Sequence, residues 1–248
     1  MIRIGTFNLN GFRSAERRGF WSWFARNELD VLCVQETRGP LDLPKSIRDW
    51  EFVERPNRFS GSAGVGMFIR PPFLPYNQPL VAVQKGRLMS IKVQGVSIHS
   101  LYAPSPYMGT HDKERIHFLE QIYQASEVWI QEPCILCGDF NVVSSMKDIH
   151  PSLLPQRRSF IHKEIAWMQR MKDLGWVDVW REMNPSVIAY SYWSHRHPQL
   201  RTENRGLRLD YQMVSPHLAK HMIATDMVGP ELMISDHAPV VVDYDLPL

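Results

Sequence analysis

The sequence has few of the features that mark secreted, membrane-bound or disulfide-stabilised proteins. Its three cysteines are an odd number, and so few on a chain of 248 residues favour a reducing compartment over a disulfide scaffold. No apolar run is long enough to span a bilayer, and the start of the chain, MIRIGTFNLNGF, has neither the long apolar core nor the cleavage pattern of a signal peptide. We therefore expect a cytoplasmic protein without a membrane partner.

Several enzyme signatures are absent as well. The chain contains no Walker A loop, no Gly-x-Gly-x-x-Gly after a strand, no Gly-x-Ser-x-Gly elbow and no His-Glu-x-x-His. The glycine-rich stretch GSAGVG at 61–66 is irregular and leads into a strand instead of a helix. The formal net charge of +2 is too small to indicate a nucleic-acid binder on its own, so the local distribution of charge must decide that question.

What the sequence does contain is an alternation of strand-like and helix-like segments. The spacing of apolar residues predicts helices over 15–27, 112–129 and 160–174. Strands are predicted over 2–9, 30–36, 64–69, 89–102 (a hairpin turning near Gly95), 134–140, 190–194, 207–215, 221–228 and 238–246. The proline-rich stretch 70–79 is predicted to be a rigid surface loop. With no repeat and no flexible linker, the pattern indicates a single domain over 1–248 with a layered α/β sandwich fold.

Polar residues lie at the ends of the predicted strands, where they are unusual. They are Asn8, Asn10, Glu36, Asp139, Asn141, Asp210 and the pair Asp236 and His237. Any one of them is explained by the preference of Asn and Asp for turns. The whole set is not, because Asp210 stands between Leu209 and Tyr211 in an otherwise apolar strand, where a buried carboxylate needs a partner or a metal.

The chemistry of this set favours phosphoester cleavage. Carboxylates and amides with little sulfur suit a hard cation such as Mg²⁺, with Mn²⁺ as an alternative ion. A histidine beside an acid suits general acid–base catalysis or stabilisation of a phosphoryl oxygen. The residues alone therefore predict a Mg²⁺-dependent phosphoesterase.

The stretch EPCILCGDFNVV at 132–143 contains a Cys-x-x-Cys pair, which invites a redox or metal-binding interpretation. Cys134 and Cys137 are three positions apart in a predicted strand, so their side chains point to opposite faces and cannot readily share a metal or a disulfide. We predict that both are small buried hydrophobic residues. The chemistry of this stretch is placed on Asp139 and Asn141 instead.

Six short motifs occur in order along nearly the whole chain. They are TFNLNG at 6–11, VQET at 34–37, LYAP at 101–104, GDFN at 138–141, LRLDY at 207–211 and SDH at 235–237. In this combination the sequence resembles the exonuclease–endonuclease–phosphatase superfamily, and within it the exonuclease III type of abasic-site endonuclease. The resemblance implies an α/β (α+β) fold, a four-layer α/β sandwich in which two packed mixed β-sheets are flanked by helices. It also implies hydrolysis of the phosphodiester 5′ to an abasic site, together with the 3′→5′ exonuclease, 3′-phosphatase and 3′-phosphodiesterase activities of many members.

The resemblance assigns a metal site to four of the polar residues. Glu36 would be the principal Mg²⁺ ligand. Asp236 would be a second ligand or a neighbour of the metal site, and Asn8 and Asn10 would complete the shell.

The catalytic groups follow from the same resemblance. Asp139 would orient or deprotonate the attacking water, and Asn141 would help to hold that water and the phosphate. His237, oriented by Asp210, would donate a hydrogen bond to a non-bridging phosphate oxygen and stabilise the transition state. Tyr102 would lie against the scissile phosphate or the leaving group, although a tyrosine at this position is also explained as a packed strand aromatic.

The partner implied is double-stranded DNA with abasic or blocked 3′ ends, bound by a monomer. Segment 194–208 carries four arginines against a single acid, Glu203, which is typical of a phosphate-backbone contact. These arginines are Arg196, Arg201, Arg205 and Arg208. An extrahelical abasic sugar would enter a small apolar pocket, and the matching positions are Tyr192, Leu207 and Leu209.

Two departures from the family pattern concern substrate fit. Leu207 stands where relatives usually have a tryptophan, and Ser105 stands where they often have an amide.

Two alternative functions also stay open. The chain resembles the catabolite-repression-control proteins of some bacteria, which share the fold but act as regulators in RNA–protein assemblies without nuclease activity. A phosphatase or sphingomyelinase of the superfamily is the third possibility. We favour the nuclease because six interdependent residues of the site are present together, namely Glu36, Asp139, Asn141, Asp210, Asp236 and His237.

Overall fold

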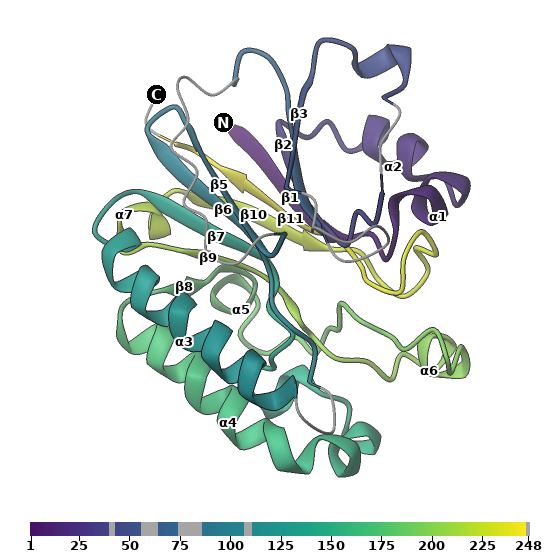
Figure 1. Cartoon of the computed structure of the whole chain (residues 1–248), viewed down its shortest axis with the longest axis vertical. Coiled ribbons are helices and arrows are strands. Elements are labelled where there is room, and N and C mark those ends of the chain that lie inside the picture. The colour runs from purple at the N-terminus through teal and green to yellow at the C-terminus, as the bar shows by residue number, and fades with distance from the viewer. Residues whose placement is uncertain (40–42, 56–63, 74–85, 107–110, 247–248) are drawn as a thin grey trace.

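The computed structural model describes residues 1–39, 43–55, 64–73, 86–106 and 111–246, and in this part of the chain two β-sheets pack face to face (Figure 1). The six-stranded sheet consists of β1 (Ile2–Asn8), β2 (Val31–Gln35), β3 (Glu51–Arg55), β4 (Val65–Ile69), β10 (Met222–Met227) and β11 (Val240–Tyr244). The five-stranded sheet consists of β5 (Leu88–Val93), β6 (Val96–Tyr102), β7 (Cys134–Asp139), β8 (Val177–Asp178) and β9 (Asp210–Val214). The spatial orders are β10-β11-β1-β2-β4-β3 and β5-β6-β7-β9-β8. Both sheets are mixed, because β1 with β2 and β6 with β7 are parallel pairs while their neighbours pair antiparallel.

Helices cover the outer face of each sheet. On the six-stranded sheet these are α1 (Phe12–Arg17) and α2 (Phe20–Arg26), and on the five-stranded sheet α3 (His111–Trp129) and α4 (Leu154–Asp173). The shorter elements are α5 (Val179–Met183), α6 (Gln199–Thr202), α7 (Pro216–Ala219) and the 3₁₀ turns η1 (Lys45–Ile47), η2 (Met146–Asp148) and η3 (Pro151–Leu153). The expected four-layer sandwich of two mixed sheets flanked by helices is confirmed.

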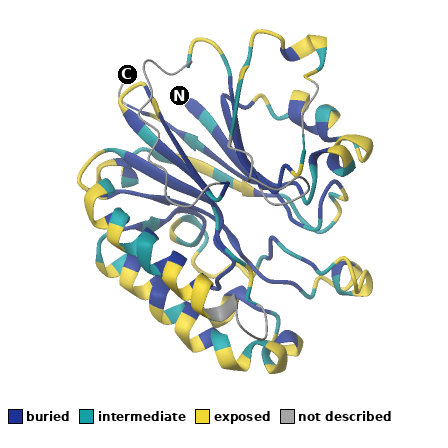
Figure 2. Ribbon diagram, viewed as in Figure 1, coloured by how far each residue is buried: buried dark blue, intermediate teal, exposed yellow. Residues whose placement is uncertain are grey.

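Successive side chains of each strand point to opposite faces of its sheet, and in this way they fill the three interfaces between the four layers. In β7, Ile135 and Cys137 pack between the sheets, whereas Cys134 and Leu136 pack beneath α3 and α4. The prediction that Cys134 and Cys137 are free, buried and on opposite faces is therefore confirmed. Figure 2 shows the result, with buried strands at the centre and exposed residues on the outer sides of the helices.

Some predicted elements differ from the structure. The single helix expected over 15–27 is two helices, because Gly19 adopts a left-handed φ of 95° between them. Segment 190–194 is no strand, and it contributes only isolated bridges from Tyr192 to Leu207 and His237. Asp210 begins β9 instead of lying inside a longer strand. The third helix starts at Leu154, six residues earlier than expected, and most of the predicted loop 70–79 lies outside the described residues. Within the described ranges, no helix combines the length and the apolar character needed to cross a membrane.

Candidate active site

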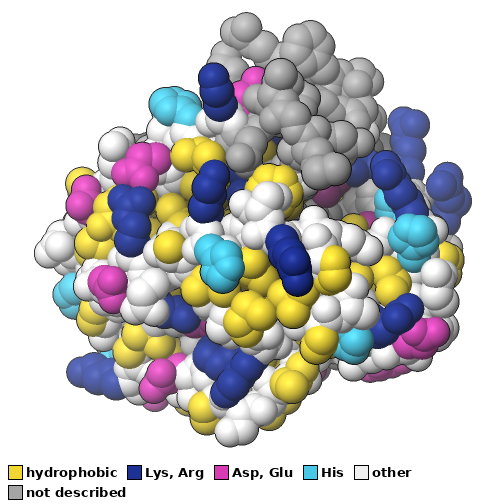
Figure 3. Space-filling view, turned by 90° about the horizontal axis from the view of Figure 1, so that it is seen from below, with side chains coloured by type: hydrophobic (Ala, Val, Ile, Leu, Met, Phe, Trp, Pro, Cys, Tyr) yellow, Lys and Arg dark blue, Asp and Glu magenta, His cyan; other side chains and the backbone are white. Residues whose placement is uncertain are grey.

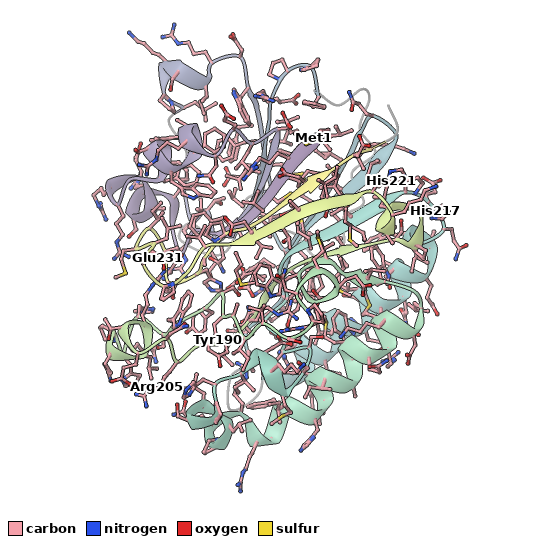
Figure 4. All side chains as sticks on the ribbon, turned by 180° about the vertical axis from the view of Figure 1, so that it is seen from behind. Met1, Tyr190, Arg205, His217, His221 and Glu231 are labelled. Carbon is pink, nitrogen blue, oxygen red and sulfur yellow. The ribbon has the colours of Figure 1, made fainter. Side chains whose placement is uncertain are left out.

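Polar side chains from both sheets meet at one edge of the sandwich. The pairing register places Tyr102 opposite Asp139 and Asp139 opposite Asp210, so these three residues form a row across the ends of β6, β7 and β9. Asp139 lies two positions after Cys137 and therefore faces the other sheet, where Asn8 ends β1. Seen from behind in Figure 4, Tyr190, Arg205 and Glu231 lie toward this end of the strands and His217 and His221 lie toward the opposite end. The site therefore lies at the edge of the sandwich, where the side chains packed between the two sheets end.

Asp139 is held by amide groups from two directions. Its Oδ2 accepts hydrogen bonds from Nδ2 of Asn8 at 2.9 Å and from Nδ2 of Asn141 at 3.1 Å. Its Oδ1 accepts the backbone N–H of Asn141 at 2.9 Å. Asn141 also donates to the carbonyl of Ala103 at 2.9 Å, which ties the turn after β7 to the end of β6. Asp139 is 1% exposed, so its carboxylate is fixed in orientation and almost shielded from solvent.

A second carboxylate orients a histidine beside Asp139. Nδ1 of His237 lies 2.8 Å from Oδ2 of Asp210, and Nε2 of His237 lies 3.8 Å from Oδ2 of Asp139. The ring of Tyr192 packs on the imidazole with ring centroids 4.9 Å apart. The other oxygen of Asp210, Oδ1, is buried without a hydrogen-bond partner among the described residues. Such an orphaned acceptor is costly unless a donor or a cation reaches it.

Burial and neighbouring charges give Asp139 and His237 unusual protonation behaviour. Burial raises the pKa of Asp139 to about 7, although the nearby charge of His237 opposes this shift. Burial also disfavours the imidazolium form of His237, but the negative charges of Asp210 and Asp139 outweigh it and raise the pKa of His237 to about 10. Near neutral pH, the site therefore combines a carboxylate able to take a proton with a charged hydrogen-bond donor.

Glu36 is connected to this centre through Asn8. The Asn8 side chain bridges two acids, because its Nδ2 also donates to Oε1 of Glu36 at 3.0 Å. The second oxygen of Glu36 forms an ion pair with Arg38. Glu36 has a φ of 54°, a left-handed conformation that costs a non-glycine residue roughly 1–2 kcal/mol. Such strain persists only where the surroundings hold it, and it concentrates at functional sites.

Tyr102 completes the row at the end of β6. Burial raises its pKa far above the usual range, and the charges of Glu36 and Asp139 add to the effect. The Arg87 guanidinium lies over the tyrosine ring, 5.1 Å from its centroid. Tyr102 therefore keeps its proton at neutral pH, and its hydroxyl is able to donate a hydrogen bond at the edge of the site.

The donor set fits a divalent cation. Asp139, Asp210 and His237 offer ligand atoms that all lie within 4.8 Å of one another. The unpaired oxygen of Asp210 and the nearby carboxylate of Glu36 are hard oxygen donors of the kind that Mg²⁺ prefers. Because His237 is paired with two acids and stays protonated near neutral pH, the carboxylates are the better candidate ligands.

Comparison with known proteins identifies the family. A model described as the endonuclease/exonuclease/phosphatase family matches residues 5–237. The chain belongs to this family. An exodeoxyribonuclease of Bacillus subtilis (strain 168) is 30% identical over 261 residues, covering 96% of this chain and 98% of the relative. A DNA-(apurinic or apyrimidinic site) endonuclease of Dictyostelium discoideum is 26% identical, covering 99% of this chain and 71% of the relative.

Solved structures share the fold. An AP endonuclease from Archaeoglobus fulgidus superimposes with a TM-score of 0.83 at 24% identity, covering 99% of this chain and 100% of the other. A 3′ phosphatase, NExo, from Neisseria bound to a product DNA hairpin gives a TM-score of 0.86 at 21% identity, with the same coverage. The two mixed sheets flanked by helices are thus the sandwich of the endonuclease/exonuclease/phosphatase family.

Two hollows flank segment 192–194 of this family member. The first, about 590 Å³, has Tyr192 and Leu207 in its wall together with Arg157, Arg196 and Arg205. The second, about 840 Å³, lies on the other side and is bordered by residues that include His195, Met233 and Asp236. Figure 3 shows the face seen from below, where Lys and Arg side chains are spread among histidine and apolar side chains and do not form one continuous patch.

Two of the four arginines predicted to bind DNA are structural instead. Arg208 is fully buried, with Nε 2.7 Å from Asp148 and Nη2 2.7 Å from Asp178. Arg201 is 7% exposed and donates to the carbonyls of Pro230 at 2.7 Å and Ser235 at 2.5 Å. Both guanidinium groups are occupied by these partners within the protein, which gives no support to the expectation that they contact a phosphate backbone.

Arg196 and Arg205 do reach the surface. Arg196 is exposed, and Arg205 pairs with Glu203 at 2.7 Å. Both side chains border the first hollow. The predicted apolar lining is divided in the same way, because Tyr192 and Leu207 face the hollow while Leu209, 2% exposed, packs beneath it.

The residues predicted as metal ligands do not all converge. Among the described residues, the group of acids and histidines with ligand spacing excludes Glu36 and Asp236. Asp236 lies 3.2 Å from Nδ1 of His195, and Asn8 directs its donor group at the acids while its oxygen accepts the N–H of Asn10. In this arrangement the amide group of Asn8 orients the carboxylates of Glu36 and Asp139, and Asn10 contributes its backbone N–H to the Asn8 oxygen.

One buried set of charges was missed by the sequence analysis. Glu164 in α4 is 1% exposed and pairs with Arg115 of α3 and Arg157 of α4. A signal did exist, because Glu164 shares a helix face with Ile161, Met168 and Met171, and a charge on an apolar face demands a partner.

Proposed function

We propose that the chain is a DNA repair nuclease that hydrolyses the phosphodiester 5′ to an abasic site and also removes blocked 3′ ends in the presence of Mg²⁺. The observation that carries this proposal is the arrangement of Asp139, Asn141, Asp210 and His237 beside a hollow lined by Tyr192 and Leu207. Family membership supports it, as do the relatives named as exodeoxyribonuclease and as endonuclease of apurinic or apyrimidinic sites. The substrate would be double-stranded DNA bound by a monomer in the cytoplasm.

Asp139 is the general base of the proposed reaction. Its carboxylate accepts a proton from the attacking water, and a pKa raised to about 7 by burial suits this task near neutral pH. Asn8 and Asn141 hold the carboxylate in place, so the water is presented to phosphorus in a fixed direction. Attack breaks the bond between phosphorus and the 3′ oxygen, which leaves as a 3′-hydroxyl after protonation from solvent.

His237 stabilises the negative charge that develops on the phosphate. Asp210 fixes the imidazole through Nδ1, so Nε2–H is the free donor and points into the same space as the Asp139 carboxylate. A charged donor in a buried site strengthens as negative charge accumulates on a non-bridging oxygen. Tyr102, which keeps its proton, would contribute a further hydrogen bond to the phosphate or the leaving oxygen.

A divalent cation would be held at the free oxygen of Asp210, with Asp139 and Glu36 as the neighbouring carboxylates. When bound, such an ion supplies charge neutralisation of the phosphate. The protein itself would hold these acids apart and in fixed orientations before an ion binds. Asn8 does so by donating hydrogen bonds to both Glu36 and Asp139.

The decisive experiment is incision of a duplex oligonucleotide that carries one abasic-site analogue, with Mg²⁺ or with EDTA. We expect Mg²⁺-dependent cleavage on the 5′ side of the lesion. Absence of incision at enzyme in excess would contradict the endonuclease proposal, and RNA-dependent association with a partner in that case would support the regulatory alternative. A 3′-phosphorylated primer measured in parallel separates endonuclease from 3′-end processing.

Substitution of the proposed groups tests their roles. We expect Asp139→Asn and His237→Asn each to lower the incision rate by at least about 100-fold, because each removes a group that acts only in the transition state. Circular dichroism should show that both variants keep the fold. Normal cleavage by either variant would refute the role assigned to that residue.

A further inference from the structure

The turn that carries Asn141 rests on three buried charged side chains from outside the five-stranded sheet. Arg115 comes from α3, and Arg157 and Glu164 come from α4. Their side chains are 3%, 13% and 0% exposed, respectively. All three therefore sit almost out of solvent, directly behind the residues of the proposed active site.

The contacts of this charged cluster converge on the backbone of the turn. Oε1 of Glu164 accepts from Nη2 of Arg115 at 2.9 Å and from Nη2 of Arg157 at 2.7 Å. The same two guanidinium nitrogens donate to the carbonyl oxygen of Asn141, at 3.0 Å and 3.4 Å. The other carboxylate oxygen of Glu164 accepts the backbone N–H of Val143 at 3.2 Å.

Asn141 is thereby held on both sides. Its carbonyl is fixed by two charged donors, and its side chain donates to Asp139 and to the carbonyl of Ala103. Its φ of 51° is left-handed, so the turn has a conformation that depends on such contacts. A rotation of this peptide would move the amide that orients the Asp139 carboxylate.

Stability alone is a weak reason for such a cluster. Buried ion pairs are often no more stabilising than apolar side chains of the same volume, because desolvation of the charges offsets their attraction. Here the surrounding layer between the sheet and α3 and α4 is already apolar. The cluster is better explained by the direction that it gives to one peptide group.

Arg157 also connects the turn with the surface. It lies near the start of α4 and borders the 590 Å³ hollow together with Tyr192 and Leu207. The Arg157 side chain therefore reaches the Asn141 backbone, and the same residue borders the space assigned to the substrate.

We propose that Arg115, Arg157 and Glu164 are positioning residues that fix the Asn141 peptide, and through it the Asp139 carboxylate, from behind the active site. The inference rests on the proposed function, since it gives these residues a role in that reaction. Arg157 is the member through which a substrate in the hollow would be sensed by the turn.

The test compares Arg157→Gln and Glu164→Gln with wild type on the abasic duplex. We expect kcat to fall roughly 10- to 100-fold while KM changes less than about threefold, because displacement of a catalytic group by about 1 Å costs this much in rate. Arg157→Lys should recover part of the loss, since its ammonium still supplies a charged donor. Arg170→Gln is the matched control, because Arg170 forms an ion pair with Glu120 across the same two helices at an exposed position, 2.9 Å from it.

Amide hydrogen exchange of residues 141–143 provides a readout that does not require activity. We expect faster exchange at Val143 in Glu164→Gln and Arg157→Gln than in wild type or Arg170→Gln, measured under conditions in which all four proteins are folded. Unchanged kcat together with unchanged exchange in the folded variants would overturn the inference, as would a loss confined to KM. If wild type cleaves no DNA, the proposed function fails, while exchange at Val143 still decides whether the cluster positions the turn.

Discussion

Leu207 is one of the residues that line the first hollow. Its side chain borders the space beside Tyr192 and packs on the small cluster that includes Ile149 and Leu209. Relatives that it resembles usually carry a tryptophan here, so the wall offers less apolar surface to an extrahelical sugar. We therefore expect the position to affect substrate fit and to leave the proposed hydrolytic groups unchanged.

We expect Leu207→Trp to raise incision at an abasic site relative to 3′-phosphate removal. The added ring would contribute about 1 kcal/mol of apolar contact to the flipped sugar, or roughly fivefold in kcat/KM. Steady-state rates on the two substrates measure the ratio. An unchanged ratio would show that the departure from the family pattern has no consequence for recognition.

Arg208 provides the opposite kind of test, because its charge serves the fold. We expect Arg208→Ala to lower the free energy of unfolding by about 3–5 kcal/mol, since Asp148 and Asp178 would each lose a buried partner. Urea unfolding measures the loss. Arg196 is exposed, so Arg196→Ala should change the free energy of unfolding by less than about 0.5 kcal/mol. Equal effects of the two substitutions would contradict the structural role of Arg208.

The contrast between Arg208 and Arg196 shows which roles a residue pattern can predict and which it cannot. Asn8, Glu36, Asp139 and Asp210 were identified because polar residues at strand ends violate the apolar pattern around them. Arg208 lies in the same basic stretch as Arg196, and its buried partners are 30 and 60 positions away. Local composition holds no information about such distant partners.

At the scale of elements, β7 depends on a glycine where it enters the site. A Cβ at Gly138 would lie 2.0 Å from the carbonyl oxygen of Leu101 on β6, and φ there is +136°. We expect Gly138→Ala to destabilise the protein by about 3 kcal/mol and to reduce activity, because the strands must separate beside Asp139. Thermal unfolding measures the change.

Gly95 is the control for backbone conformation alone. It has a φ of +83° in the hairpin between β5 and β6, with nothing within 4 Å of an added Cβ. We expect Gly95→Ala to cost only about 1 kcal/mol and to leave activity intact. A similar loss in both variants would show that the close approach of β6 and β7 is unimportant.

The interface between the five-stranded sheet and α3 contains a buried histidine whose pKa is lowered. His99 on β6 stacks on Trp129 with centroids 4.2 Å apart and lies 2.6 Å from the hydroxyl of Ser90, and burial lowers its pKa to about 3. Its neutral form is stabilising above the unfolded pKa of about 6.5, and this contribution declines as pH falls from there toward 3, because only the unfolded chain takes up the proton.

We therefore expect the free energy of unfolding to fall by about 2 kcal/mol more in wild type than in His99→Gln between pH 7 and pH 5. Urea titrations at the two pH values measure the difference. His162→Gln, at an exposed position of α4, should behave as wild type. Parallel pH dependence of wild type and His99→Gln would exclude this account.

The strong periodicity of apolar residues made most helices and strands predictable. The remaining differences arise from local backbone conformation that this periodicity does not reveal. The hairpin at Gly95 and the strands that lead to Asn8 and Asp139 follow the expected pattern. The break at Gly19 escaped detection because Phe20, Trp23 and Phe24 keep helical spacing beyond it. Segment 190–194 is strand-like in composition, yet its β-bridges within the described part of the chain are isolated ones at Tyr192.

At the scale of the whole molecule, weak net charge makes DNA binding depend on a few cations. With a formal charge of +2, attraction must come from locally gathered cations, and Arg196 and Arg205 beside the hollow are such side chains. We expect Arg196→Ala to reduce the slope of log Kd against log salt by about 1, since each phosphate contact releases close to one counterion. Arg170→Ala, in the exposed pair with Glu120, should leave the slope unchanged.

The order of the strands has a consequence for synthesis of the protein. β1 pairs with β11, Ile2 opposite Tyr244 and Thr6 opposite Val240, while the five-stranded sheet comes entirely from the middle of the chain. Asn8 and Asp139 therefore leave the ribosome long before the strand that pairs with β1, and His237 emerges just ahead of that strand. A nascent chain cannot assemble the catalytic edge before β11 has been made, so the proposed activity arises only after that point in synthesis.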